Sequence, residues 1–416
     1  MLDTSYVRLL SPAQRLAEWW QEVKENYETE FWRDTEKFFR ELLKTLMEIT
    51  MEEETIMYTG IQWYKRGEER IDYRNGYRYR CFLTKHGWID DIKVPRLRKT
   101  KFCTKVFKSY QRRQEAVDQA LRDIFIAGVS TRRVGEALSC LLDAPISATT
   151  ISNVTKTIDS KVKEFQNRPL LDEYQYLILD GINLSVRHSL EYKKRAVLVA
   201  YGITCFGYRE LISFRQVPRE SKSKWIAFLE DIKYRGLEGK NLKLITVDGH
   251  KGLLAAIDEV YPFIPIQRCW AHKMRNVVSY LPKRYQKECS GQASLIYNAP
   301  NKLEAIKQFK MWKSKWQKIN SETAHCLQKD LDQMLNFFDC PQPHRIKVRT
   351  TNVIERSFRE VRRRTRTMNC FTNEASCDRI IYCIFNHLNN HWKELPLKNF
   401  SQFNSLLKRS NYTLFA

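Results

Sequence analysis

The sequence predicts an α/β fold that is built on one mixed sheet and preceded by a mostly helical N-terminal region. Three consecutive strand patterns occur between residues 174 and 217. Helical and strand patterns then alternate as far as residue 281, which is typical of a sheet with helices packed on its faces. A polar, helix-rich segment separates this part from a final arginine-rich helix. We therefore expect a helical insertion within the α/β domain.

The composition indicates a protein that binds a polyanion. The 416 residues carry 71 Lys and Arg against 48 Asp and Glu, so the formal net charge is +23. Such an imbalance is typical of nucleic-acid-binding proteins and says little about the fold. With 43% hydrophobic residues at this length, we expect two or three domains with real cores.

Neither export nor membrane insertion is predicted. The longest uncharged runs, such as Ala196–Tyr208, are about 13 residues long, whereas a membrane-spanning helix needs about 20 apolar residues. The first residues have neither the apolar stretch nor the cleavage site of a signal peptide. The 11 cysteines lack framework spacing, which is typical of free thiols in a reducing compartment. We expect a cytoplasmic nucleic-acid-binding protein.

The first 113 residues predict helices followed by a basic hairpin. Residues 12–50 have apolar positions close to a 3.6-residue period, and either ordinary helix packing or self-association explains them. Residues 65–113 hold 16 Lys and Arg against five Asp and Glu, and alternating patterns predict two short strands with Gly76 and Gly87 near the turns. Such a segment suits a phosphate-contacting surface, although a solvated basic face would look the same. The candidate DNA contacts are Arg74, Arg78 and Arg80.

Three helical patterns follow over residues 111–160. The last two are separated by a short turn at Asp143–Ile146 and resemble a helix-turn-helix, whose final helix reads a DNA groove. Ser147 or Thr149 can cap that final helix. Many helical pairs share this rhythm, so ordinary packing is an equal alternative. The candidate DNA contacts are Arg132, Arg133, Thr149, Thr150 and Asn153.

Residues 174–281 carry the strand and helix patterns of the α/β domain, and residues 282–345 are helical and polar. We expect strands over 174–182, 193–204, 208–217, 242–249 and 264–269, and helices over 221–236, 250–261 and 271–281. The expected domains are N-terminal helices over 1–60, a DNA-binding region over 61–165, the first part of the core over 166–281, the helical insertion over 282–345, the final core helices over 346–395 and a tail over 396–416.

Two of the strand patterns end in an acid that is followed by glycine. Asp180 follows YLIL and Asp248 follows LITV, and glycine at the next position lets a backbone or a substrate approach closely. Together with Glu355 on a later helix, these carboxylates could converge over one edge of the sheet. Three acids that close would raise each other's pKa values unless a cation neutralised them. Strand-end aspartates also cap turns, which is the alternative for each aspartate taken singly.

Oxygen-only ligands of this kind predict a hard metal ion. The expected cofactor is Mg²⁺ or Mn²⁺, with Asp180, Asp248 and Glu355 as ligands. Two such ions, expected with DNA bound, can activate an attacking oxygen and stabilise a leaving one in phosphoryl transfer.

The helix that carries Glu355 is rich in arginine, which indicates an anionic partner. Several of these arginines recur at helical spacing and so share or flank the face of Glu355. A solvated helix that keeps the protein soluble is the alternative. The candidate backbone contacts are Arg356, Arg359, Arg362, Arg363 and Arg366.

Seven blocks carry a family resemblance. They are RNGYRYR, GVSTRRVGEALSCLL, ISATTISNVTKTID, LDGINL, TVDGHKGL, QRCWAHKMRNV and TTNVIERSFREVRRRTRTM. In this order they resemble the motif series of the Mutator-type transposases of bacterial insertion sequences, from about residue 70 to 395. The resemblance implies a ribonuclease-H-like catalytic core, with a helical insertion before the last acid. By matching motifs, the acid triad maps to Asp180, Asp248 and Glu355, and the family's Cys-x-x-His maps to Cys269 and His272.

The pair Cys269 and His272 has several interpretations. A structural zinc site would need four ligands, and no second pair has suitable spacing. We favour a catalytic role for His272, which would lie at the start of a helix near the acids and hydrogen-bond a phosphate or water. A packed cysteine with a surface histidine is the alternative.

The sequence therefore predicts a magnesium-dependent DNA transposase. It would bind terminal inverted repeats, cleave DNA at the transposon ends and join the 3′-hydroxyl ends to target DNA. We expect a homodimer or higher oligomer on DNA, associated with the nucleoid and not with a membrane. A ribonuclease-H-like nuclease or resolvase, which hydrolyses without joining, is the same-fold alternative. A non-enzymatic DNA-binding regulator is the other, but it would not need acids at two strand ends.

Overall fold

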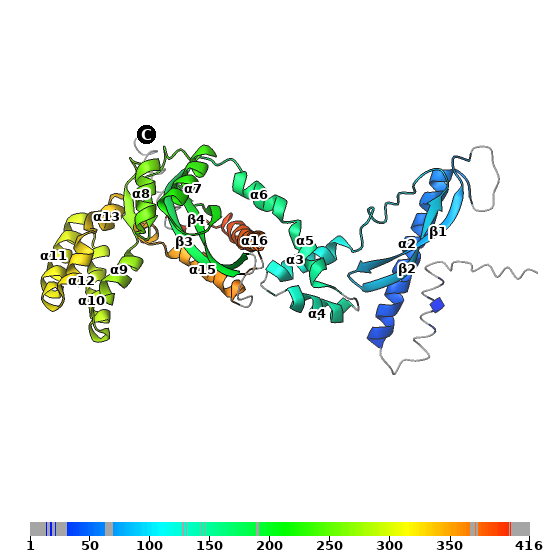
Figure 1. Ribbon diagram of the computed structural model, residues 1–416, viewed down its shortest axis with the longest axis horizontal. Coiled ribbons are helices and arrows are strands. Elements are labelled where there is room, and N and C mark those ends of the chain that lie inside the picture. Colours follow the sequence, from blue (N-terminus) through cyan, green and yellow to red (C-terminus); the bar gives the residue numbers. More distant parts are fainter. Residues whose placement is uncertain are drawn as a thin grey trace, which may run out of the picture. The chain divides into compact units, whose positions relative to one another are not determined.

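A computed structural model describes residues 31–62, 70–126, 131–142, 146–188, 191–366 and 373–398, together with a few single residues outside these ranges. Figure 1 shows the described helices and strands. The chain divides into two compact units, residues 1–156 and residues 157–416. Each unit is described by itself.

The first unit begins with helix α2, Phe31–Thr59, which packs on a two-stranded antiparallel hairpin. Strand β1 spans Arg74–Thr84 and strand β2 spans Gly87–Leu97, which confirms the predicted hairpin. Gly87 begins β2 directly after the turn, with φ +112°, a conformation that favours glycine. Gly76 does not lie at a turn as predicted. It lies in β1 with φ +68°, where the register shifts between Arg74 and Tyr77, so it forms an irregularity within the strand.

Three short helices complete this unit, as the pattern over residues 111–160 predicts. They are α3, Glu115–Ile126, α4, Thr131–Leu142, and α5, Ala148–Lys156. Their apolar faces share one core with Leu83 of the hairpin. The Ser147 hydroxyl accepts a hydrogen bond from the Thr150 amide at 3.1 Å and so caps α5.

The second unit is built on one five-stranded mixed sheet, as predicted. Strands β3, Tyr174–His188, β4, Glu191–Thr204, and β5, Arg209–Val217, form an antiparallel meander. Strands β6, Leu244–Val247, and β7, Ile266–Arg268, run parallel to β3, so the sheet order is β5-β4-β3-β6-β7.

Helices cover both faces of this sheet (Figure 1). The face of β3 that carries Leu177 and Leu179 shares a core with α7, Lys222–Tyr234, and α8, Lys251–Val260. The other face packs on three helices. They are α6, Asp159–Asn167, α15, Asn352–Thr365, and α16, Glu374–Trp392. Because side chains alternate along a strand, Asp180 lies on the α15 side and Gly181 on the α7 side.

The segment between β7 and α15 is helical, as its polar pattern predicts. Trp312 and Trp316 lie one turn apart and are both buried, and their indole N–H groups donate to the Cys289 carbonyl and the Gln292 side chain. The helices are α9, Trp270–Ser279, α10, Lys283–Tyr297, α11, Lys302–Ile319, α12, Ser321–Gln328, α13, Leu331–Leu335, η1, Asn336–Asp339, and α14, Gln342–Val348.

The last described residues pack against this unit. The Phe400 ring is fully buried and stacks on His344, with ring centroids 3.7 Å apart. The Leu397 amide donates to the Gly207 carbonyl at 2.9 Å. In the described parts of the chain, no helix has the length and apolar character that crossing a membrane requires.

Candidate active site

Asp180 and Asp248 lie at adjacent positions on neighbouring parallel strands. Leu179 pairs with Val247, the last residue of β6, and each aspartate is the next residue along its strand. The sequence placed Asp180 at a strand end, and this is wrong because β3 continues to His188. The strand is longer than predicted because its second half continues to pair with β4 beyond the end of β6, and Phe371 bridges its other edge at Val186. Asp180 therefore lies where the parallel part of the sheet stops.

The turn after β6 orients Asp248. Gly249 has φ +98°, and the His250 amide donates to Asp248 Oδ1 at 2.9 Å. His250 is the N-cap residue of α8, as a helix-start histidine would be. Asp248 thus makes a turn-capping contact, which is the alternative to a catalytic role for an aspartate at a strand end. That contact leaves the second carboxylate oxygen for another role.

Asp180 is a buried carboxylate in a strongly negative neighbourhood. The residue is only 6% exposed, and its pKa is raised from 3.8 to about 7, chiefly by burial. The charges of Asp248 and Glu355 contribute to this rise, while the Gly181 amide, which donates at 2.8 Å, and His272 oppose it. The ionised form of Asp180 therefore needs a positive charge close by.

Glu355 reaches the same neighbourhood from the first turn of α15. Its Oε1 lies 2.7 Å from Arg275 Nη2 and 3.5 Å from His272 Nε2, and both of these residues belong to α9. Helix α9 follows β7 directly and starts beside the end of β6, where the Cys269 amide donates to the Val247 carbonyl at 2.7 Å. The acids of β3, β6 and α15 thus share one end of the parallel strands with the cations of α9.

The Cys-x-x-His segment joins α9 to the start of α15. The Thr351 amide and hydroxyl both donate to the Cys269 sulfur, at 3.3 and 3.4 Å, and the same hydroxyl lies 3.3 Å from His272 Nδ1. Burial alone would raise the pKa of the Cys269 thiol, but hydrogen bonds from His272 and Thr351 bring it below the ordinary value. The hydrogen bond with Cys269 raises the pKa of His272, and burial partly opposes this rise. These contacts position the helix that carries Glu355.

Comparisons with known proteins decide the family. The family model for transposases of the Mutator family matches residues 17–395. The chain belongs to the Mutator family of transposases. It is 34% identical over 355 residues to the transposase for insertion sequence element ISRM5 of Rhizobium meliloti, with 85% of this chain and 88% of that protein covered.

Two further relatives have similar names. The transposase for IS406 of Burkholderia multivorans is 34% identical over 355 residues, covering 85% of this chain and 90% of the relative. The transposase for IS256 in transposon Tn4001 of Staphylococcus aureus is 31% identical over 365 residues, with the same two shares. Among solved structures, a chain of a simian T-cell lymphotropic virus intasome in complex with a PP2A regulatory subunit is 15% identical. The match covers 41% of this chain and 58% of the intasome-complex chain. Its TM-score of 0.17 is too low to bear on the fold.

A further carboxylate of this Mutator-family chain was missed by the sequence reasoning. Glu220 lies just before α7, and a Cβ atom on Gly181 would lie 2.4 Å from its Oε1. Burial raises the pKa of Glu220, His250 lowers it and Asp248 raises it. Gly181 therefore lets a side chain approach the acids from the α7 face. No motif marks Glu220, and the glycine after Asp180 was the only signal available.

The arginines of α15 differ in their surroundings. Arg363 and Arg364 both pair with Glu360, at 3.1 and 2.5 Å, and Arg364 is largely buried. The remaining predicted contacts on this helix are exposed to solvent: Arg356, Arg359, Arg362 and Arg366. The cation that meets Glu355 is instead Arg275, which no sequence pattern indicated.

The predicted DNA contacts of the first unit also differ in their surroundings. Arg78, Arg133, Thr149 and Asn153 are exposed. Arg74 donates to the Ile61 carbonyl, Thr150 contacts the capping Ser147, and Arg80 donates to the Gln111 carbonyl. The side chain of Arg132 lies outside the described residues.

The carboxylates fit a hard cation by their chemistry. Asp180, Asp248 and Glu355 offer only oxygen donors, and the opposing effect of His272 does not offset the rise in the pKa of the buried Asp180. Within the residues that the structure describes, however, no three or more His, Cys, Asp or Glu side chains form a ready-made metal-ligand group. Glu355 faces Arg275 and His272 instead.

Proposed function

We propose that this chain is a DNA transposase of an insertion sequence, which cleaves DNA at the transposon ends and joins the 3′-hydroxyl ends to target DNA. One observation carries this proposal. Asp180 and Asp248 occupy adjacent positions on parallel strands, and Glu355 is close enough to raise the pKa of Asp180. The names of the relatives, all transposases of insertion sequences, support the same conclusion.

A ribonuclease-H-like core is part of this proposal. Two features support it: the five-stranded mixed sheet with Asp180 on its central strand β3 and Asp248 directly after the neighbouring β6, and the all-helical segment between β7 and the helix of Glu355. Both agree with the order of elements that the family resemblance implies.

Each residue of the candidate site has a distinct role in this proposal. Asp180, Asp248 and Glu355 would hold Mg²⁺ or Mn²⁺, with two ions when DNA is bound. Such ions supply activation of the attacking oxygen and stabilisation of the leaving one. Because its pKa is about 7, Asp180 is partly protonated at neutral pH and becomes fully ionised only when a positive charge arrives. Arg275 and His272 would hold Glu355 in place until then.

DNA binding would involve both units. The basic hairpin and the helices of the first unit would read terminal inverted repeats, and the exposed arginines of α15 would contact phosphates near the cut. A charge of +23 gives such binding a strong dependence on salt. The assembly on DNA would be a homodimer or a higher oligomer.

The test uses the purified full-length chain, labelled transposon-end DNA and Mg²⁺. We expect nicked ends and joined products from the wild type. Asp248→Asn and Glu355→Gln should lower both by orders of magnitude and leave DNA binding intact. The matched control is Asp258→Asn, at an exposed position of α8. Nicks without joined products would favour a nuclease or resolvase. Near-normal cleavage by either acid variant would remove that acid from the site.

A further inference from the structure

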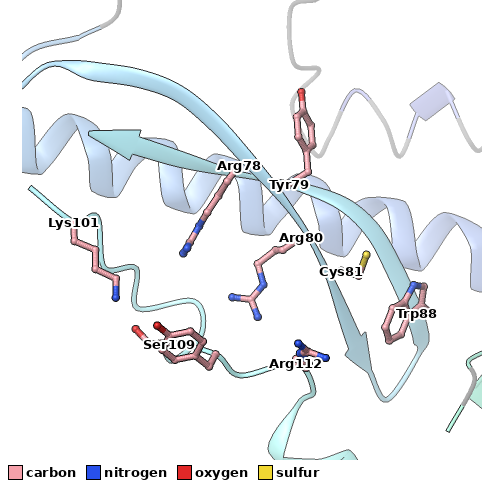
Figure 2. Close-up of a pocket in the computed structure, with 9 residues that line it drawn as sticks. Arg78, Tyr79, Arg80, Cys81, Trp88, Lys101, Ser109 and Arg112 are labelled. Carbon is pink, nitrogen blue, oxygen red and sulfur yellow. The ribbon is translucent and has the colours of Figure 1, made fainter. Parts of the chain in front are cut away.

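The first unit contains a hollow that no catalytic role explains. The hairpin and the loop that follows β2 enclose a cavity of about 520 Å³, within the range of roughly 300–1,000 Å³ that ligand sites have. Figure 2 shows Arg78 and Arg80 extending from β1 towards this loop, while Tyr79 points away. The residues that matter below are Arg78, Arg80, Trp88, Lys101, Tyr110 and Arg112.

The hollow is strongly basic. Of the described residues that line it, four are cations and none is a carboxylate. The Arg80 guanidinium lies 3.9 Å from the centroid of the Phe107 ring and donates to the Gln111 carbonyl. These two contacts hold it in one position in the lining of the hollow. Burial lowers the pKa of Arg80, and the charges of Arg78 and Arg112 lower it further. Among residues 70–126, Arg78 and Arg112 have no carboxylate partner. An anion is therefore the natural occupant.

The hollow also presents aromatic faces. Tyr110 is 91% exposed and has φ +62°, a backbone conformation that bulky residues rarely adopt. Lys101 lies 5.7 Å from the centroid of its ring. Trp88 lines the same hollow and is tied by its indole N–H to Asp90. Holding an exposed ring on a backbone of positive φ costs free energy, and such strain is typical of functional sites where a ligand contacts the residue.

We propose that this hollow binds one unpaired nucleotide of DNA, with the base stacked on Tyr110 and its phosphate held by Arg78 and Arg112. The proposal rests on the proposed function only in taking DNA as the polymer. Phosphate alone would need the cations and not the rings, whereas an unstacked base uses both. A base within a duplex is already stacked on its neighbours, so a concave site of this kind selects a single strand or an extruded base.

The variants are chosen to keep the backbone intact. Tyr110→Asn removes the ring and places a residue that tolerates positive φ, and Tyr110→Phe keeps the ring. Tyr73→Ala is the aromatic control, because Tyr73 is 47% exposed and does not line the hollow. Arg112→Ala removes one cation that lines the hollow, and Arg96→Ala removes an exposed cation on β2 outside it.

The experiment measures fluorescence anisotropy of three labelled DNAs with the full-length chain in metal-free buffer. They are a ten-nucleotide oligothymidylate, an abasic strand of the same length and a duplex of random sequence. Tyr110→Asn should weaken binding of oligothymidylate about ten-fold or more and leave the other two unchanged. Tyr110→Phe and Tyr73→Ala should behave as wild type. Arg112→Ala should weaken both single strands and lower their salt slope by about 0.7, and Arg96→Ala should not.

Three outcomes would overturn the proposal. They are no binding of oligothymidylate by the wild type, equal losses for Tyr110→Asn and Tyr73→Ala, and a loss for Tyr110→Asn on the abasic strand or the duplex as large as that on oligothymidylate. Cleavage of transposon ends by the wild type, measured separately with Mg²⁺, tells this failure apart from a failure of the proposed function.

Discussion

Replacing Asp180 by Asn should make the metal-free protein more stable while abolishing cleavage. The asparagine nearly preserves the shape and can still accept from the Gly181 amide, but it removes a charge that the fold disfavours. A pKa of about 7 against an ordinary value of 3.8 corresponds to about 4 kcal/mol of unfavourable interaction for the ionised carboxylate. Because the environment relaxes, we expect a gain of about 1–4 kcal/mol at pH 8.

The sign of the pH dependence follows from the same shift. The folded-state pKa of Asp180 is raised, so the folded protein binds more protons than the unfolded chain between pH 3.8 and about 7. Wild-type stability therefore falls as pH rises through this window, and the gain from Asp180→Asn should grow with it. Near pH 4 the two proteins should differ little.

Urea unfolding at several pH values measures this gain, with Asp258→Asn as the control for removal of an exposed aspartate. Adding Mg²⁺ should stabilise the wild type more than Asp180→Asn, since only the wild type keeps all three carboxylates. An Asp180→Asn protein that is less stable than wild type at pH 8 would refute the reasoning. It would mean that the carboxylate is held by favourable contacts and is not strained by its neighbours.

Three further predictions concern other parts of the chain. Phe400→Ala should lower the free energy of unfolding by about 3–5 kcal/mol in urea titrations, because the ring is fully buried, whereas Tyr234→Ala, at a 92% exposed position, should change it little. Arg359→Ala should reduce the salt slope of DNA binding by about 1 without changing sequence preference; a base-specific loss would contradict a backbone contact. Burial lowers the pKa of His344 to about 4, so the wild type should lose up to about 3 kcal/mol as pH falls from 6.5 to 4, relative to His344→Gln; equal losses would exclude His344 as the cause.

Local patterns predicted the strands of the second unit well. The runs before Asp180 and Asp248 are apolar apart from Thr246, because these strands are buried on both faces. The sheet then brings the two aspartates together, because each directly follows one residue of the registered pair Leu179 and Val247. The length of β3 was not predicted, because its second half alternates in burial and is held by long-range pairing with β4 and a bridge to Phe371.

Contacts between distant segments escaped the sequence reasoning. Glu220 lies against Gly181, and Arg275 pairs with Glu355. The residues of each pair are distant in sequence, and no periodic pattern links them. The basic hollow depends in the same way on a loop that folds back over β1. Gly76 was misplaced because glycine marks turns and strand irregularities alike.

The helical segment between β7 and α15 starts and ends at almost the same place. The Trp270 amide donates to the Arg349 carbonyl at 3.1 Å, and Thr351 bonds to the buried Cys269. Both ends of this segment are thus held beside the acids. The helices between them form an excursion, that is, an insertion whose two ends are in contact. We expect changes of length beyond α9 to leave Glu355 in place, because His272 and Arg275 of α9 hold it. The contacts of Gln267 and Arg268 with Met334 and Asp330 would have to be kept as well.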